Sequence, residues 1–129
     1  MKLAIGIIAL GLAHLAPLQT NSTTIAFDNT DYNFGTVKEG KNITHTFTFK
    51  NTGKYDFVIK EVDASCDCMV PTLPKGPVKP GATGTIVVVF NTSGQAKAKR
   101  QSSKSVTITA NTIPAKTNLY MQGYVLPMR

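Results

Sequence analysis

Alternation of apolar and polar residues over Ile43–Lys50 is the feature that most restricts the fold of this chain. Its apolar residues and His45 share one face, while three threonines and Lys50 share the other. A period of two is typical of a half-buried β-strand, and β-branched and aromatic residues favour the extended backbone. Turn residues follow at Asn51–Lys54, and a second strand-like segment comes next, Tyr55–Val62. We therefore expect these two segments to pair as a β-hairpin.

Short strands separated by turns are also expected in the rest of the chain. Thr83–Phe90 is strand-like on both faces, which predicts a central strand. Pro71–Gly81 holds four prolines and two glycines, which predicts an ordered surface loop. After a polar connection, Asn91–Ser103, two more strands are expected, Lys104–Asn111 and Lys116–Val125. About seven short strands without a helical pattern predict an all-β, immunoglobulin-like β-sandwich.

The first sixteen residues have the pattern of a secretory signal peptide. Lys2 precedes an apolar run, Leu3–Ala13, which is followed by small residues. The run is too short to cross a membrane, which takes roughly 20 apolar residues. Cleavage is expected after Ala13, or after Ala16 as the second choice. The mature protein would then be exported into an oxidising compartment.

The composition is basic, with 14 Lys and Arg against 7 Asp and Glu. Loss of Lys2 with the signal peptide leaves 13 against 7, a net charge of +6. In an exported protein this charge favours acidic glycans, anionic lipid surfaces or acidic proteins as partners over nucleic acid. Solubility alone is the alternative reason for such a charge.

Four basic residues fall within eight positions near the C-terminus and are the candidate binding residues: Lys97, Lys99, Arg100 and Lys104. None of the seven acidic residues lies after Asp67, so no carboxylate in this half of the sequence neutralises them. Loops on a β-scaffold are frequent carriers of binding function. The alternative is a solvated run of charge without function.

Both cysteines lie in Ser65–Pro71, SCDCMVP, with one residue between them. On a regular strand their Cα atoms would lie about 6.6 Å apart with parallel side chains, which is poor geometry for a disulfide. A Cys66–Cys68 disulfide therefore needs a local turn, and an oxidising compartment favours it. Two structural thiols, a Cu(I) site that adds Met69 and a redox pair are the alternatives. No metal is favoured, because zinc needs four ligands and the mature chain has one histidine.

That histidine is His45, whose register with apolar residues predicts that it caps the core with one ring nitrogen hydrogen-bonded. Ser65 and Ser105 could be considered as nucleophiles, but neither lies in a nucleophile motif. Glycine-rich phosphate loops, paired carboxylates and metalloprotease helices are also missing from the sequence. The sequence thus predicts no enzyme and no cofactor.

Five motifs follow one another in a fixed order: Phe34–Gly40 (FGTVKEG), Thr44–Gly53 (THTFTFKNTG), SCDCMVP, Lys79–Ile86 (KPGATGTI) and Met121–Val125 (MQGYV). Together they closely resemble a secreted bacterial family called domain of unknown function 1573 (DUF 1573). This family is similar to ASH and major-sperm-protein domains, which are immunoglobulin-like protein-binding modules. The resemblance implies an exported immunoglobulin-like domain over residues 24–129 and brings no catalytic residues. One position departs from the family pattern, since Asp67 stands where relatives carry Gly between the cysteines.

The combined prediction is a non-catalytic binding module, periplasmic or at the surface of a Gram-negative bacterium. Its partner would be an envelope or surface protein, an acidic glycan or an anionic lipid surface. The alternative is a periplasmic copper-binding or thiol-redox protein that uses Cys66, Asp67 and Cys68.

Overall fold

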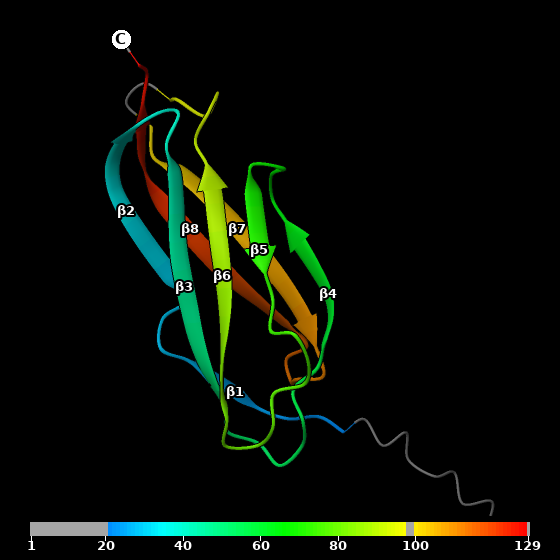
Figure 1. The fold of residues 1–129 in the computed structure, drawn as a ribbon. Coiled ribbons are helices and arrows are strands. Elements are labelled where there is room, and N and C mark those ends of the chain that lie inside the picture. Colours follow the sequence, from blue (N-terminus) through cyan, green and yellow to red (C-terminus); the bar gives the residue numbers. More distant parts are fainter. Residues whose placement is uncertain (1–20, 98–99, 129) are drawn as a thin grey trace, which may run out of the picture.

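A computed structural model of the chain describes residues 21–97 and 100–128. The predicted signal peptide and Lys99 lie outside the described residues. Eight strands form two sheets packed face to face (Figure 1), which confirms the all-β sandwich. The strands are β1 (Ile25–Phe27), β2 (Asp31–Lys38), β3 (Asn42–Asn51), β4 (Ile59–Ala64), β5 (Met69–Thr72), β6 (Thr83–Asn91), β7 (Ser102–Ala110) and β8 (Lys116–Leu126).

Each sheet has four strands, in the orders β1-β3-β6-β5 and β2-β8-β7-β4. All neighbouring strands are antiparallel except β2 and β8, which run parallel. The chain changes sheets between β1 and β2, within residues 28–30. Among the described residues, four strands are therefore sheet edges: β1 and β5 in one sheet, β2 and β4 in the other.

The predicted hairpin between Ile43–Lys50 and Tyr55–Val62 is wrong. β3 pairs with β1 and β6, whereas β4 lies in the other sheet and pairs with β7. Asn51 explains the difference, because its buried side chain donates to the carbonyls of Tyr55 and Val78 at 2.7 and 2.9 Å. These bonds hold the chain in a wide corner that crosses between the sheets.

The strand at Thr83–Phe90 is central as expected, since β6 lies between β3 and β5. The proline-rich loop begins later than expected, because Pro71 and Thr72 belong to β5. Asn91 donates its N–H to the carbonyl of Cys68 at 2.8 Å. Cys68 and Asn91 thus form a hydrogen-bonded pair, and such pairs recur at every second residue of an antiparallel ladder. Val70 is therefore bonded to β6, whereas the nitrogen of Pro71 faces the free edge of the sheet, where no donor is needed.

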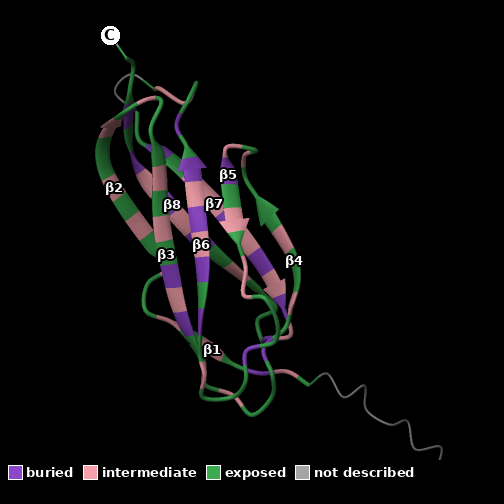
Figure 2. Ribbon diagram, in the orientation of Figure 1, coloured by how far each residue is buried: buried purple, intermediate pink, exposed green. Residues whose placement is uncertain are grey.

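The core lies between the sheets, and along most strands more buried and more exposed residues alternate (Figure 2). Phe47, Phe49 and Phe90 contribute from one sheet and Leu119 and Met121 from the other, each at most 1% exposed. Burying one such side chain contributes roughly 1.5–3 kcal/mol to the free energy of folding. The core is therefore the main source of stability and holds the loops at both ends of the sandwich.

The parallel seam between β2 and β8 brings the first and last sequence motifs together. The register shifts between Asn33 and Gly35, and Gly35 has a φ of 74°. A Cβ at Gly123 would lie 2.5 Å from both the Gly35 carbonyl oxygen and the Phe34 ring. Gly123 thus leaves the space in which Phe34 packs across the seam.

Candidate functional site

The end of the sandwich that carries the β2–β3 turn is built by backbone hydrogen bonds between distant segments. Glu39 donates its N–H to the Leu126 carbonyl at 2.8 Å, which ties the turn to the end of β8. The N–H and hydroxyl of Thr92 both donate to the Lys41 carbonyl, at 3.1 and 2.7 Å. The β2–β3 turn, the β6–β7 loop and the C-terminal strand therefore meet at one end (Figure 1).

Two of the predicted binding residues lie in the loop at this end. Lys97 and Arg100 are exposed, and the Lys97 N–H donates to the Val125 carbonyl at 3.0 Å. Lys104 lies within β7 and is half-buried. It shares the inward face of Val106 and Ile108, so its side chain does not project with the other two. The predicted grouping on one loop and the start of a strand is thus found as two exposed loop residues and one strand residue whose side chain lies on the inward face.

The fold also brings two further cations to this end, which are not among the predicted binding residues. Lys38 ends β2 opposite Leu126, and Lys41 lies in the turn bonded to Thr92, both exposed. We call Lys38, Lys41, Lys97 and Arg100 the basic end. Lys38 and Lys41 lie more than fifty positions before Lys97, so no local pattern in the sequence predicts that they share a surface with it.

Glu39 is the acidic residue between Lys38 and Lys41, and it is half-buried. Its carboxylate accepts a hydrogen bond from the Met128 N–H at 3.4 Å. Gly40 follows with a φ of 100°, which allows the tight turn that exposes both neighbouring lysines. Asp67 is exposed in the β4–β5 turn, which adjoins Asn91 at the same end, so the four cations face two carboxylates and the local charge balance is positive.

The cysteine pair lies in the turn between β4 and β5. Cys66 and Cys68 are joined in a disulfide with Cα atoms 5.1 Å apart. The Met69 N–H donates to the Cys66 carbonyl at 3.1 Å, which closes the turn that brings the two residues together. Met69 itself is 4% exposed and belongs to the core. Copper binding by these two sulfurs would first require reduction of the disulfide.

The serines and the histidine have structural contacts. The Ser65 hydroxyl accepts the Ser105 N–H at 2.9 Å, and the Ser65 N–H donates to the Ser105 carbonyl. The His45 ring stacks on Tyr32 at 3.8 Å and lies edge-on to Phe47 at 4.6 Å. Burial lowers the pKa of His45 below its usual value of 6.5. Across residues 21–97 and 100–128, His, Cys, Asp and Glu form no group of three suited to a metal ion.

Residues 25–125 match the family described as "Protein of unknown function (DUF1573)". The chain belongs to this family. The DUF1573 match covers all but the last residue of the eight strands and includes both cysteines and the β2–β3 turn. No curated protein matches the chain significantly. The described residues contain no helix long and apolar enough to cross a membrane.

Solved structures with the same fold include a protein of unknown function from Porphyromonas gingivalis W83 (TM-score 0.68, 12% identity, 80% of this chain and 47% of that one). This chain thus spans about half of that protein. The ASH/PapD-like domain 7 of human CEP192 is similar at a TM-score of 0.59 and 12% identity, over 84% of this chain and 89% of that one. The E. coli chaperone DraB is similar at 0.55 and 12%, over 83% and 57%. At these identities the likeness establishes an immunoglobulin-like, PapD-type fold for the DUF1573 domain.

Proposed function

We propose that this DUF1573 protein is an exported, non-catalytic binding module whose basic end contacts an anionic component of the bacterial envelope. The observation that carries the proposal is the convergence of two loops and the C-terminal strand, which gathers four exposed cations from separate parts of the sequence. Export is supported by the N-terminal pattern of charge and apolar residues and by the disulfide in the β4–β5 turn.

A non-catalytic role is supported by the contacts of the candidate nucleophiles and base. Ser65 holds the end of β4 to β7 through Ser105, and His45 packs among aromatic rings. A serine nucleophile works when a histidine, itself held by a third group, lies within hydrogen-bond reach. The proposal accordingly includes neither a catalytic residue nor a cofactor.

Anionic surfaces suit the basic end for a physical reason. Clustered charges of one sign raise the local concentration of oppositely charged ligands. The effect decays over a Debye length of about 8 Å at physiological ionic strength. Binding should therefore weaken steeply as salt is added.

The test compares retention of the mature protein on an acidic polysaccharide resin with its co-sedimentation on phosphatidylglycerol vesicles, both across a salt series. The basic-end variant replaces the four residues of the basic end, and with them the predicted binding residue Lys99, with Gln. Lys104→Gln is examined separately. The control variant replaces five lysines at the opposite end and along the proline-rich loop: Lys50, Lys54, Lys75, Lys79 and Lys116.

We expect the basic-end variant to lose binding at a salt concentration where the control variant still binds, with an unchanged melting temperature because exposed charges contribute little to stability. Binding to the resin alone would identify an acidic glycan, and binding to vesicles alone a lipid surface. Equal losses in both variants would show that net charge, and not the basic end, determines binding.

A further inference from the structure

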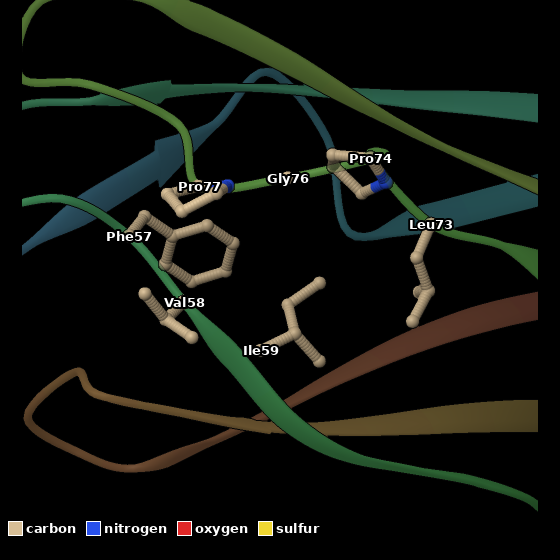
Figure 3. A pocket seen from close by; sticks show the side chains of 7 residues that line it. All are labelled: Phe57, Val58, Ile59, Leu73, Pro74, Gly76 and Pro77. Atoms are coloured by element: carbon tan, nitrogen blue, oxygen red, sulfur yellow. The ribbon is translucent and has the colours of Figure 1, made fainter.

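A small apolar cavity opens between the segment before β4 and the loop after β5. It has a volume of about 180 Å³, and its walls are Phe57, Val58 and Ile59 on one side and Leu73, Pro74, Gly76 and Pro77 on the other (Figure 3). All of these residues are apolar, and the volume suits one large aliphatic side chain. The hollow is smaller than the clefts of roughly 300–1,000 Å³ that hold drug-sized ligands, so it suits a single side chain of a larger partner.

The walls of the cavity are held in place by hydrogen bonds. Phe57 and Val78 exchange two backbone hydrogen bonds, at 2.8 and 3.0 Å, which join the two sides. The Val58 N–H donates to the Asn111 side chain at 2.8 Å. The cavity is thus preformed, and a ligand would not need to order it first.

Directly beside the cavity lies the edge of β4, which within residues 21–97 and 100–128 pairs with β7 alone and is free on its other side. The Ser65 N–H donates to the Ser105 carbonyl. Because every second residue of an antiparallel strand bonds to the same neighbour, the peptide groups of Asp63 and Glu61 also face β7. The peptide groups of Val62 and Ala64 consequently face the free edge. A strand added there would place side chains opposite Val62 inward, toward the cavity side of the sandwich.

The other three edges are less suited to strand addition. β1 has three residues. β5 offers the nitrogen of Pro71 where a donor would be required. β2 is interrupted by the register shift next to Gly35. β4 has its irregularity at Lys60, near its start, and a regular ladder from Glu61 to Ala64.

The outward face of β4 carries two carboxylates, and Lys60 is exposed beside them at the register shift. Glu61 and Asp63 are exposed and lie opposite Thr109 and Thr107 of β7, which are neutral. Asp67 is exposed in the turn that follows. Opposite charges directly across a strand pair are favourable, so this face suits a strand with basic outward side chains.

We propose that the β4 edge binds an extended segment of a partner protein in which apolar and basic residues alternate. The apolar residues lie opposite Val62 and Ala64, with one of them in the cavity beside Ile59 and Leu73. The basic residues lie opposite Glu61 and Asp63. This interaction is independent of the basic end, which would repel such a segment.

The test uses a capped nine-residue peptide of alternating Lys and Val, with a Glu-Val peptide of the same length as the ligand control. Binding is measured by fluorescence anisotropy, and amide hydrogen exchange of the protein is measured with and without peptide. We expect the Lys-Val peptide to bind and to slow exchange at Val62 and Ala64.

Three variants locate the site. Ala64→Pro removes a donor at the free edge, and Ala64 is exposed and keeps its ladder to β7 through its neighbours, so binding should be lost in a folded protein. Glu61→Lys with Asp63→Lys should weaken Lys-Val binding about tenfold and create affinity for the Glu-Val peptide. The charge-matched control is Asp28→Lys with Asp31→Lys, two exposed residues outside β4, which should bind like the wild type.

The proposal is wrong if neither peptide binds. It is also wrong if the peptide slows hydrogen exchange outside β4 and this protection persists in Ala64→Pro. The acidic residues would then serve only to keep the edge unpaired, as charges on sheet edges commonly do.

Discussion

Asn51 shows how one polar residue can determine the path of the chain. It is fully buried, and its amide makes four hydrogen bonds: two as donor to the Tyr55 and Val78 carbonyls, and two as acceptor from Thr23 and Gly53. Because every donor and acceptor site is used, the cost of burying the amide is offset. The same bonds connect the N-terminal segment, the corner after β3 and the proline-rich loop.

Replacing Asn51 with Ala should lower the free energy of unfolding by about 3 kcal/mol, because several buried polar groups lose their partners. Urea unfolding measures the change. Asn42→Ala, at an exposed position on the same strand, is the control and should change stability by less than about 0.5 kcal/mol. A loss equally small for Asn51→Ala would contradict the role of this amide in the corner.

His45 should make stability depend on pH. Burial disfavours its charged form, so its pKa in the folded state lies below the unfolded value. Between these two pKa values the unfolded chain binds more protons, so stability rises with pH. The contribution of neutral His45 is fully present above the unfolded pKa, near 6.5, and is lost as the pH falls through the folded value.

Urea unfolding at pH values of about 7.5 and 5 should therefore show a larger loss for the wild type than for His45→Gln. Asp28 and Asp31 line the same hollow as His45 and are present in both proteins, so the comparison isolates the histidine. Parallel pH profiles for the two proteins would refute this prediction.

At the scale of elements, the β4–β5 turn joins the edges of the two sheets, and its disulfide encloses only three residues. A short closed loop restricts the unfolded chain little, so the bond should contribute about 1–2 kcal/mol. Cys66 and Cys68 are partly buried and pack against the margin of the core, whose fully buried side chains come from the strands.

Reduction, or the double variant Cys66→Ser with Cys68→Ser, should thus leave the fold intact and lower stability by that small amount. Circular dichroism and urea unfolding with and without reductant measure this, and the reductant should not affect the double variant. We also expect the reduced protein to lose Cu(I) readily to a chelator. A sub-nanomolar Cu(I) complex would support the copper-binding alternative instead.

At the scale of the whole molecule, export is the prediction on which compartment and cysteine chemistry depend. The protein isolated from its native host should lack the first thirteen or sixteen residues by intact mass. Ile7→Lys with Leu10→Lys interrupts the apolar run and should leave full-length protein in the cytoplasm. Full-length wild-type protein in the cytoplasm would contradict export.

Local patterns in the sequence were sufficient for the fold class and for much of the strand content. The alternation over Ile43–Lys50 depends only on neighbouring residues, and a period of two leaves few alternatives to a half-buried strand. The central strand at Thr83–Phe90 was also predicted from its own residues, because apolar residues on both faces favour a strand between two others. The five ordered motifs also carried the resemblance to the family, which the match over residues 25–125 confirms.

Strand pairing and the composition of the candidate sites were decided by the tertiary structure. β3 and β4 are neighbours in sequence, but Asn51 and the shared core place them in different sheets. Lys38 and Lys41 join Lys97 and Arg100 through bonds between residues far apart in the chain. Which strands are edges, and which side chains line the cavity at Ile59 and Leu73, likewise depend on long-range packing. No local pattern encodes these contacts, because they form only when two sheets bury their apolar faces against each other.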